Sequence, residues 1–384
     1  MARQKKPPEE QNLLRFIRVD ADAHIPLAAQ LAQQIVWLMA SGDVKAGDKL
    51  PPVRELAERL GINRHTVRAA YARLQASGLV IMRQGRGTVV LPHDAQSLAQ
   101  IAPITPTFTI GILIPGLNPF YHPFLEGIDD AARGAPWLFF VSYTRESPEL
   151  AARYVDQLVA KRVDGLILAT GGLHVKARKS EGGSRDRDLP PVVSVDLPDA
   201  PGHAILLDSE GAGFRVTEHL VQHDHRRIGM VSGPLEFANL RECYRGYERA
   251  LASAGLAVDR ELVAEEPFFS IEAGRQGAER LLDLPEPPTA IFGAADLFAI
   301  GAMQAVKERG LRVPEDIAVA GYNDIELAAL VDPPLTTAHA PAYEMGVAAM
   351  TMLRRLINGE RVKPRCVTLD TPLVVRRSCG CGET

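Results

Sequence analysis

Three basic side chains stand together at the start of one segment whose spacing is typical of a helix. In NRHTVRAAYARLQASG, Arg64, His65 and Arg68 lie near the beginning, off an apolar stripe that repeats every three or four residues. An arginine fork donates paired hydrogen bonds that fit the acceptor edge of guanine as well as a phosphate. The pattern therefore predicts a helix whose N-terminal end enters the major groove of DNA.

Two further arginines are placed to reach a DNA backbone. Arg54 opens the preceding periodic segment, and Arg86 lies between Gly85 and Gly87 in a turn. Glycine has no Cβ, so the main chain of such a turn can approach a phosphate closely. Any one of these arginines alone would be an ordinary solvated side chain, but their joint placement favours DNA contacts.

The elements that must position these residues are three helices and a hairpin. Apolar spacing predicts a first helix that ends at Gly42 and a second that runs from Val53 to Gly61. The third lies between Asn63 as its N-cap and Gly78 as its stop. Two extended runs, LVIMRQ and GTVVL, flank the Gly-Arg-Gly turn as a wing. This is the outline of a winged helix-turn-helix domain.

Charge is unevenly distributed along the 384 residues. Residues 1–91 hold 14 Lys and Arg against 8 Asp and Glu, whereas the remainder holds 29 against 39. A positive head on an acidic body fits a phosphate-binding module joined to a second module, because only the head must approach a polyanion. No apolar run is long enough to span a membrane and the first residues lack a signal-peptide core, so we expect a cytoplasmic protein without membrane association.

Cysteine and histidine side chains offer two weak candidates for a metal site. Cys379 and Cys381 form a C-x-C pair without a second pair of ligands nearby in the sequence, which favours an ordinary tail. His219, His223 and His225 fall at the end of an amphipathic segment that leads into a strand. We therefore predict neither a metal nor a cofactor.

The body alternates apolar strand runs with amphipathic helices. It follows a stretch with three prolines and no sustained period, which predicts a linker. About 270 residues of alternation exceed what one sheet needs, so we expect an α/β fold with two parallel-sheet lobes covered on both faces. The predicted organisation is a flexible arm, a winged helix-turn-helix domain, a linker and an effector domain at residues 1–22, 23–91, 92–107 and 108–378.

The head resembles the GntR family of regulators. The stretches PLAAQLAQQI, GDVKAGDKLPPVRELAERLGINRHTVRAAYARLQASGLV and RQGRGTVV follow that family's DNA-binding domain nearly end to end. At Pro52 this sequence lacks the Ser or Thr that usually caps the second helix, a loss that costs about 1 kcal/mol and leaves binding intact. The resemblance implies DNA contacts by Arg54, Asn63, Arg64, Thr66, Arg68 and the wing from Gly85 to Gly87.

The body resembles the effector domain of the LacI/GalR family, which shares the fold of periplasmic sugar-binding proteins. IGILIPGLNPFYHPFLEGIDDAA, VDGLILAT, TEHLVQHDHRRIGMVSG, PPTAIFGAADLFAIGAMQAVKERGLRVPEDIAVAGYNDIELAALVDPPLTT and the final LVVRRS are among the stretches that carry the resemblance. It implies two Rossmann-like lobes hinged around a cleft, with three chain crossings. The first lobe is expected at about 108–207 and 342–360, and the second at about 208–341 and 361–378.

Candidate ligand-binding residues follow the strand runs, because parallel α/β sheets bind ligands at the carboxyl ends of their strands. Three positions depart from the sugar-binding family, since Cys243, Ala295 and Asn323 replace the usual Arg, Asn and Asp. Arg241 or Asp296 can take their place, or the ligand is less hydroxylated or charged. The full set is Asn118, Phe120, Tyr121, Phe124, Thr170 and Asp199 in the first lobe, and Arg241, Cys243, Phe269, Ala295, Asp296 and Asn323 in the second.

These features together predict a ligand-responsive transcription regulator. The expected partners are an operator in double-stranded DNA, a small effector such as a sugar or related metabolite, and a second copy of the chain. We expect a repressor that an inducer releases by closing the cleft. The linker lacks the hinge-helix pattern of the LacI family, so we expect looser coupling. The alternative is a body that has lost its ligand and serves only for dimerisation.

Two other classes of protein are disfavoured. A pyridoxal-phosphate enzyme body would need a Schiff-base lysine at a strand end, and G-x-S-x-G, P-loop and H-E-x-x-H signatures are missing. We therefore expect no enzymatic activity. A transport-type binding protein would carry a signal peptide and no DNA-binding head.

Overall fold

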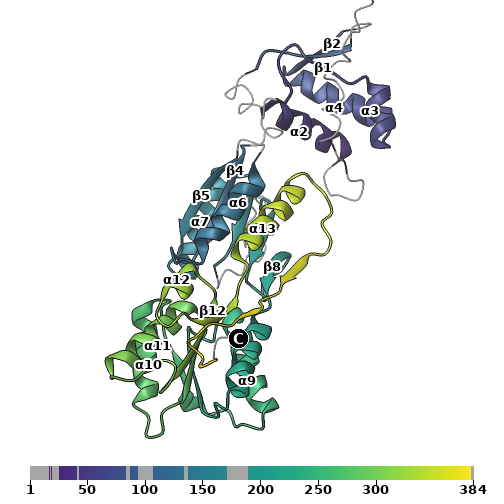
Figure 1. Ribbon diagram of the computed structural model, residues 1–384. Helices are drawn as coiled ribbons and strands as arrows, with labels where there is room; N and C mark the ends of the chain where they lie inside the picture. The colour runs from purple at the N-terminus through teal and green to yellow at the C-terminus, as the bar shows by residue number, and fades with distance from the viewer. Residues whose placement is uncertain are drawn as a thin grey trace, which may run out of the picture.

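The computed structural model describes residues 17, 19, 26–40, 43–83, 87–93, 107–133, 137–170 and 189–381. They form a small N-terminal domain followed by two α/β lobes (Figure 1). Within these residues, no helix combines the length and the apolar character needed to cross a membrane.

The N-terminal domain packs three helices around one apolar core and adds a three-stranded antiparallel sheet of order β1-β3-β2. Val67, Ala70, Tyr71 and Leu74 recur every three or four residues and are all buried, so the predicted stripe is the packed face of the third helix. The elements are α2 (Leu27–Ala40), β1 (Lys49–Leu50), α3 (Val53–Leu60), α4 (Arg64–Ala76), β2 (Val80–Arg83) and β3 (Gly87–Val90).

The first lobe is a parallel six-stranded sheet of order β14-β8-β7-β6-β4-β5. Its central strands are largely apolar and almost entirely buried, because helices cover both faces of the sheet. Its elements are β4 (Thr109–Ile114), α6 (Tyr121–Ala132), β5 (Leu138–Tyr143), α7 (Pro148–Ala160), β6 (Gly165–Leu168), β7 (Val192–Val195), β8 (His203–Leu207), α13 (Ala342–Ile357) and β14 (Cys366–Leu369).

The second lobe repeats this plan with the order β10-β9-β11-β12-β13-β15, in which only β15 runs antiparallel to its neighbour. Its elements are α8 (Ser209–Gln222), β9 (Ile228–Ser232), α9 (Ala238–Ser253), the 3-10 helix η1 (Arg260–Leu262), β10 (Val263–Glu265), α10 (Ile271–Leu282), β11 (Ala290–Gly293), α11 (Asp296–Glu308), β12 (Ala318–Asn323), α12 (Glu326–Leu330), β13 (Thr336–His339) and β15 (Leu373–Val374).

The chain passes between the lobes after β8, after β13 and after β14. The last boundary corrects the expectation that residues 361–378 belong to the second lobe. β14 pairs in parallel with β8, from Cys366 opposite Ala204 to Leu369 opposite Leu207. A short edge strand carries no sequence signal for the sheet that it joins, so its partner becomes visible only in the fold.

Two of these crossings are tied to each other by one side chain. Arg215 on α8 donates to the carbonyl oxygen of Thr371 and to Oδ2 of Asp208, each at 3.0 Å. The hydroxyl of Thr371 donates in turn to the carbonyl oxygen of Asp208 at 2.9 Å. The connection therefore joins the segment after β8 to the segment after β14.

Helices pack in pairs through glycines that let their backbones touch. A Cβ on Gly213 of α8 would lie 2.0 Å from the carbonyl oxygen of Cys243 on α9. Because real atoms do not approach so closely, only glycine fits there. The same arrangement joins three helix pairs, through Gly213 and Gly246 (α8 and α9), Gly127 and Gly346 (α6 and α13), and Gly274 and Gly301 (α10 and α11).

Candidate DNA-binding surface and ligand cleft

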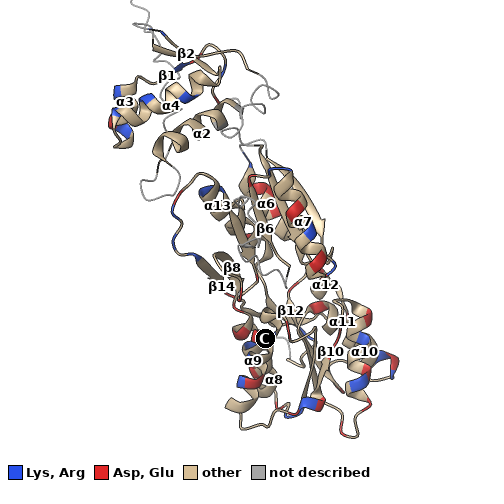
Figure 2. Cartoon of the chain, turned by 180° about the vertical axis from the view of Figure 1, so that it is seen from behind, with Lys and Arg blue, Asp and Glu red and all other residues tan. Residues whose placement is uncertain are grey.

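The first turn of α4 presents basic side chains to solvent. Arg64, His65 and Arg68 are exposed, whereas Tyr71 on the other face is buried and donates to the carbonyl oxygen of Pro51 at 2.7 Å. Packing of the buried face fixes the rotation of α4 about its own axis, so the basic side chains of its first turn point toward solvent. Figure 2 marks the arginine positions of α3 and α4 in blue on the ribbon.

Asn63 caps α4 as predicted, since its side chain accepts a hydrogen bond from the backbone N–H of His65 at 2.8 Å. Glu58 on α3 joins the two helices, because its Oε1 accepts from Arg54 at 2.9 Å and from Arg64 at 3.5 Å. The hydrogen bond from Arg54 is the largest of the effects that lower the pKa of Glu58. The two exposed guanidinium groups are therefore held on one side of the domain.

The start of α3 and the wing have the expected local structure. No side chain caps α3 at Pro52, and Gly61 ends the helix in the left-handed conformation. Strands β2 and β3 pair as a hairpin, in which Arg83 lies opposite the exposed Gly87. Thr66 is half-buried on α4. The other two predicted wing residues, Gly85 and Arg86, lie outside the described residues.

A cleft with a volume of about 610 Å³ lies between the two lobes. This volume is in the range of small-molecule binding sites. Elements of both lobes contribute, because the strands of each sheet end at this gap. The predicted residues that line it are Asn118, Phe120, Tyr121 and Asp199 from the first lobe, and Phe269, Ala295, Asp296 and Asn323 from the second.

Three predicted cleft residues lie beneath the surface instead, which corrects this part of the expectation. Phe124 is fully buried on the inner face of α6, one turn beyond the cleft residues. Thr170 is buried and its hydroxyl is 2.7 Å from that of Thr144. Cys243 is fully buried where α9 packs on α8. Cys243 is therefore not part of the cleft lining.

Arg241 stands near the cleft rather than in its lining. Its guanidinium donates to Oδ2 of Asp199 at 2.8 Å and to the carbonyl oxygen of Glu236 at 3.1 Å. Asp199 belongs to the first lobe and Arg241 to the second. This ion pair therefore bridges the two lobes next to the lining.

Aromatic rings wall the cleft from both lobes. Phe120 and Tyr121 make an edge-to-face contact with centroids 5.2 Å apart, and Phe269 packs at 5.2 Å on the buried Phe298. The hydroxyl of Tyr121 reaches the carbonyl oxygen of Ala169 at 3.5 Å. Rings fixed in this way offer flat apolar surfaces to a ligand. Phe237 and Tyr322 also line the cleft, although the sequence analysis did not single them out.

Asp196, at the end of β7, is the functional candidate that the sequence analysis missed. Its Oδ2 accepts from Nδ2 of Asn239 at 2.8 Å, across the lobe boundary. Its Oδ1 is buried and has no hydrogen-bond partner among the described residues. Burial raises the pKa of Asp196 to about 7, and hydrogen bonds from Asn239 and from the backbone of Leu207 oppose this rise.

Asp296 lines the cleft but directs its carboxylate into the second lobe. Oδ2 accepts from the backbone N–H of Ile325 at 2.8 Å, and Oδ1 accepts from the hydroxyl of Thr337 at 2.6 Å. Burial raises the pKa of Asp296 to about 7. Its position holds the loop after β12 in place, so the side chain is not a free acceptor for a ligand.

The charged residues that line the cleft within the described chain are all acidic. They are Glu146, Asp196, Asp199, Glu236 and Asp296, and neither lysine nor arginine belongs to the described lining. A negatively charged ligand would meet repulsion at such a surface. The cleft is therefore suited to neutral or positively charged molecules.

Comparisons with known proteins agree with this geometry. A family model described as bacterial regulatory proteins, gntR family, matches residues 27–90, and one described as a periplasmic binding protein-like domain matches residues 217–379. The HTH-type transcriptional repressor CytR of Escherichia coli K12 is 33% identical over 273 residues, which cover 70% of this chain and 79% of CytR. The chain belongs to the LacI-type family of transcriptional repressors.

Solved structures of regulators share the fold of this LacI-type repressor. The transcriptional regulator CelR in complex with cellobiose is 27% identical, has a TM-score of 0.62, and matches over 85% of this chain and 99% of its own. The transcription regulator GntR from Chromobacterium violaceum is 29% identical with a TM-score of 0.62, over 71% and 99% of the two chains. The protein is thus a ligand-responsive, DNA-binding repressor that joins a GntR-type head to a LacI-type effector domain.

Proposed function

We propose that this LacI-type repressor reads its operator with the first turn of α4 and releases it when a small ligand closes the cleft. The observation that carries the proposal is the cleft, in which aromatic rings from both lobes surround the buried carboxylate of Asp196. A buried acceptor without a partner costs about 1–3 kcal/mol. A hydroxyl or amino group of a ligand would satisfy it.

The lining defines the class of ligand. Carboxylates without a compensating lysine or arginine in the described lining favour a neutral or cationic molecule, and the rings favour a ligand with one apolar face. A sugar or a related metabolite with donor groups fits both requirements. The similar protein CelR was solved with cellobiose, which supports the sugar class. Anionic sugar phosphates are the disfavoured alternative.

Two contacts across the lobe boundary supply a mechanism for closure. Asn239 bonds Asp196, and Arg241 bonds Asp199, so α9 of the second lobe meets the loop after β7 of the first. A ligand shifts operator affinity only when it binds the two lobe arrangements unequally. A ligand that contacts residues of both lobes would do so, because such contacts are lost when the lobes separate.

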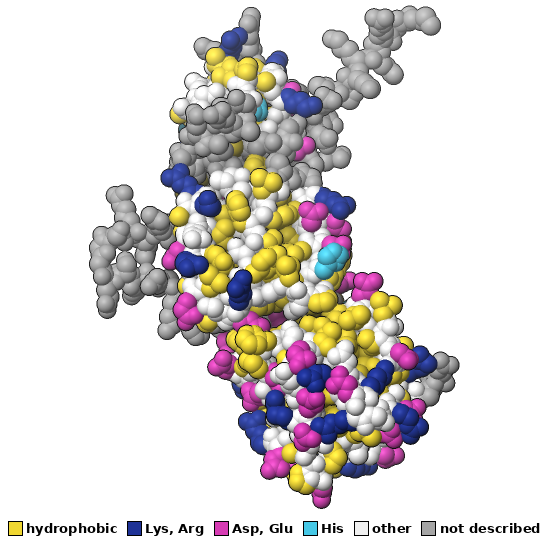
Figure 3. Space-filling view, turned by 90° about the vertical axis from the view of Figure 1, so that its left-hand side faces the viewer, with side chains coloured by type: hydrophobic (Ala, Val, Ile, Leu, Met, Phe, Trp, Pro, Cys, Tyr) yellow, Lys and Arg dark blue, Asp and Glu magenta, His cyan; other side chains and the backbone are white. Residues whose placement is uncertain are grey.

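We propose that the repressor acts as a homodimer through an apolar surface on the first lobe. The edge strand β5 exposes Leu138 by 65% and Phe140 by 43%. Figure 3 shows hydrophobic side chains gathered on the side of this lobe that carries the edge. Apolar patches of this kind mark protein interfaces. A Leu138→Glu, Phe140→Glu double variant should sediment as a monomer, whereas the unchanged chain should sediment as a dimer.

A body kept only for dimerisation is the competing interpretation. Dimerisation alone requires no ligand cavity. Substitutions that fill or flatten the cleft would then be tolerated. A cleft of about 610 Å³ with fixed rings and an unsatisfied acceptor favours retained ligand binding.

The test is an anisotropy titration of full-length protein on labelled DNA from upstream of its own gene. Cellobiose, other neutral sugars, nucleosides and amino sugars are added in turn, with sugar phosphates as matched anions. We expect one neutral or cationic class to weaken operator binding by at least tenfold. Specific binding that no compound alters, together with no thermal shift from any of them, would contradict the ligand-controlled mechanism.

A further inference from the structure

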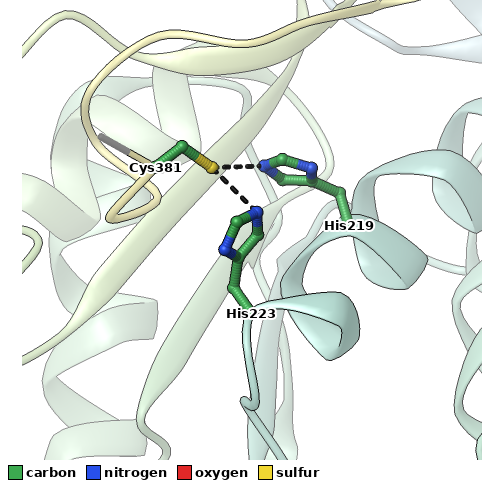
Figure 4. A group of neighbouring side chains, drawn as sticks. All are labelled: His219, His223 and Cys381. Atoms are coloured by element: carbon green, nitrogen blue, oxygen red, sulfur yellow. Dashed lines mark hydrogen bonds between the residues drawn. The ribbon is translucent and has the colours of Figure 1, made fainter. Parts of the chain in front are cut away.

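Three side chains with metal-ligating atoms meet at the C-terminal end of α8, away from the cleft, and a fourth lies next to two of them. His219 and His223 come from α8, and Cys381 comes from the segment after β15 (Figure 4). The Sγ atom of Cys381 lies 3.1 Å from Nε2 of His219 and 3.0 Å from Nε2 of His223. Cys379 lies beside them, with its Sγ 3.0 Å from that of Cys381 and 3.3 Å from Nε2 of His219.

The local backbone places the two histidines on one side and the two cysteines on one side. His219 and His223 are one helical turn apart, so both rings project from the same face of α8, with centroids 4.7 Å apart. Gly380 separates the two cysteines with a φ of 84°, a conformation that glycine adopts freely. This turn brings both thiols to the same side of the chain.

The cysteine segment is fixed to the second lobe before any cation binds. The hydroxyl of Ser378 donates to the carbonyl oxygen of Val319 at 2.6 Å and accepts from the backbone N–H of Thr336 at 2.9 Å. The hydroxyl of Thr336 then donates to Sγ of Cys379 at 3.0 Å. A hydrogen bond to a thiolate ligand from a neighbouring hydroxyl is a common support of metal sites.

We propose that His219, His223, Cys379 and Cys381 form a binding site for a thiophilic divalent cation of the zinc class. Two imidazoles and two thiolates are a donor set that zinc takes in tetrahedral geometry, whereas magnesium and calcium prefer oxygen ligands. With bonds of about 2.0 Å to nitrogen and about 2.3 Å to sulfur, ligand atoms around zinc lie about 3.3–3.8 Å apart. The separations among His219, His223 and Cys381 need to widen by about half an ångström. Cys379 lies outside the group of three whose ligand atoms are all within 4.8 Å of one another, so its thiol must move toward His223 to complete the site.

The two halves of the site lie far apart in the sequence. Cys381 follows His223 by 158 residues. Considered separately, the C-x-C pair and the histidine group each lacked the ligands needed to complete a site, and we expected no metal. The fold brings the histidines and the cysteines together, so each group supplies the ligands that the other lacks.

The cation would fasten the end of the chain to α8. Arg376, five residues before Cys381, donates to Oδ1 of Asp324 at 2.6 Å in the loop that follows β12. Ser209, in the first turn of α8, lines the cleft. Metal binding would therefore stiffen the second lobe and raise its resistance to unfolding, because the unfolded chain holds these ligands apart.

The experiment uses the full-length chain, stripped with a chelator and then reloaded with Zn²⁺ or, as a spectroscopic probe, Co²⁺. Elemental analysis should find about one Zn²⁺ per chain, and Co²⁺ should give the intense visible bands of tetrahedral thiolate coordination. Cys381→Ser and His223→Ala should each weaken Zn²⁺ binding by more than about 100-fold, and Thr336→Val by about 10-fold. Cys379→Ser should weaken binding and reduce the thiolate-to-Co²⁺ absorption.

Two matched controls separate this site from adventitious binding. Cys366 is an exposed thiol on β14, and His225 is the adjacent histidine, whose ring bonds Thr289 at 3.0 Å. Cys366→Ser and His225→Ala should keep full affinity, and Zn²⁺ should raise the melting temperature of these variants but not of Cys381→Ser. The proposal is overturned by substoichiometric metal in the intact chain, by loss of binding in either control, or by a stable Cys379–Cys381 disulfide that forms in place of metal binding. Unchanged binding in Cys379→Ser would remove Cys379 as a ligand.

Discussion

Asn239 of the second lobe donates a hydrogen bond to Oδ2 of Asp196 in the first lobe at 2.8 Å, while Oδ1 of the same carboxylate has no partner among the described residues. One oxygen therefore links the lobes, and the other is buried without a partner beside the cleft. Because both atoms belong to one rigid group, a ligand that binds Oδ1 also fixes the orientation of Oδ2 toward α9. This shared group couples occupancy of the cleft to the lobe arrangement.

Asp196→Asn should weaken ligand binding without unfolding the protein. The amide keeps the size of the carboxyl group but replaces one acceptor oxygen with an NH₂ donor, and leaving a buried donor or acceptor without its partner costs about 1–3 kcal/mol. We expect a loss of about 10- to 100-fold in affinity for the compound that the anisotropy screen selects, measured by calorimetry. Operator affinity in the absence of ligand should change by less than about threefold. An unchanged ligand affinity would remove Asp196 from the binding site.

The pH dependence of stability should report the same carboxylate. Burial raises the pKa of Asp196 to about 7, so the folded state retains a proton that the unfolded chain loses near pH 4. Its contribution to the free energy of unfolding therefore falls as the pH rises from about 4 to about 7, and is constant above that range. The loss is at most about 4 kcal/mol for a shift of three pH units.

Urea unfolding of the unchanged chain and of Asp196→Asn across this pH range isolates the effect. The asparagine variant lacks the titration, so its advantage should grow with pH up to about 7. Asp296, whose pKa burial also raises to about 7, is present in both proteins and cancels in the difference. A difference that does not vary with pH would show that Asp196 has the same pKa in the folded and unfolded states.

Arg64→Ala should weaken operator binding by about 10- to 100-fold, because an arginine paired with a guanine contributes about 1–3 kcal/mol of discrimination. Arg73→Ala is the matched control, since it removes the same side chain from the last turn of the same exposed helix. It should alter affinity by less than about twofold. Anisotropy titrations on operator and scrambled DNA measure both. Equal losses in the two variants would place another part of α4 in the groove.

The fold was largely predictable because its signals are local. Leu31, Ile35, Val67 and Leu74 lie on helical stripes whose burial follows from periodicity, and the apolar strand runs of the body predict sheets covered on both faces. Gly61 marks the end of α3 because glycine adopts the left-handed conformation freely, and Asn63 marks the start of α4 because its side chain caps the helix. The edge strand β14 was assigned to the wrong lobe because pairing between distant strands leaves no local trace.

The cleft was only partly predictable. Position after a strand selected Asn118 and Asp199 correctly for the lining but could not say which way each side chain turns. Cys243 points into the core of its lobe, whereas Asp196, three residues before Asp199, lines the cleft and has a left-handed backbone φ of 53°. Such a choice depends on packing from the other lobe. The cluster at Cys381 likewise depends on a contact between segments far apart in the sequence.

Gly213→Ala should destabilise the second lobe, although alanine is the better helix former. In an open helix this change would stabilise by about 1 kcal/mol. Here the added Cβ would lie 2.0 Å from the carbonyl oxygen of Cys243, so α8 and α9 must separate. Overpacking of this kind costs about 1–3 kcal/mol, and the backbone obstacle places the cost at the upper end.

Urea unfolding followed by circular dichroism should show the loss of stability in Gly213→Ala. Gly246→Ala should show a similar loss, because its Cβ would lie 2.0 Å from the carbonyl oxygen of Glu210. A stability equal to or above that of the unchanged chain would mean that the two helices can separate without cost.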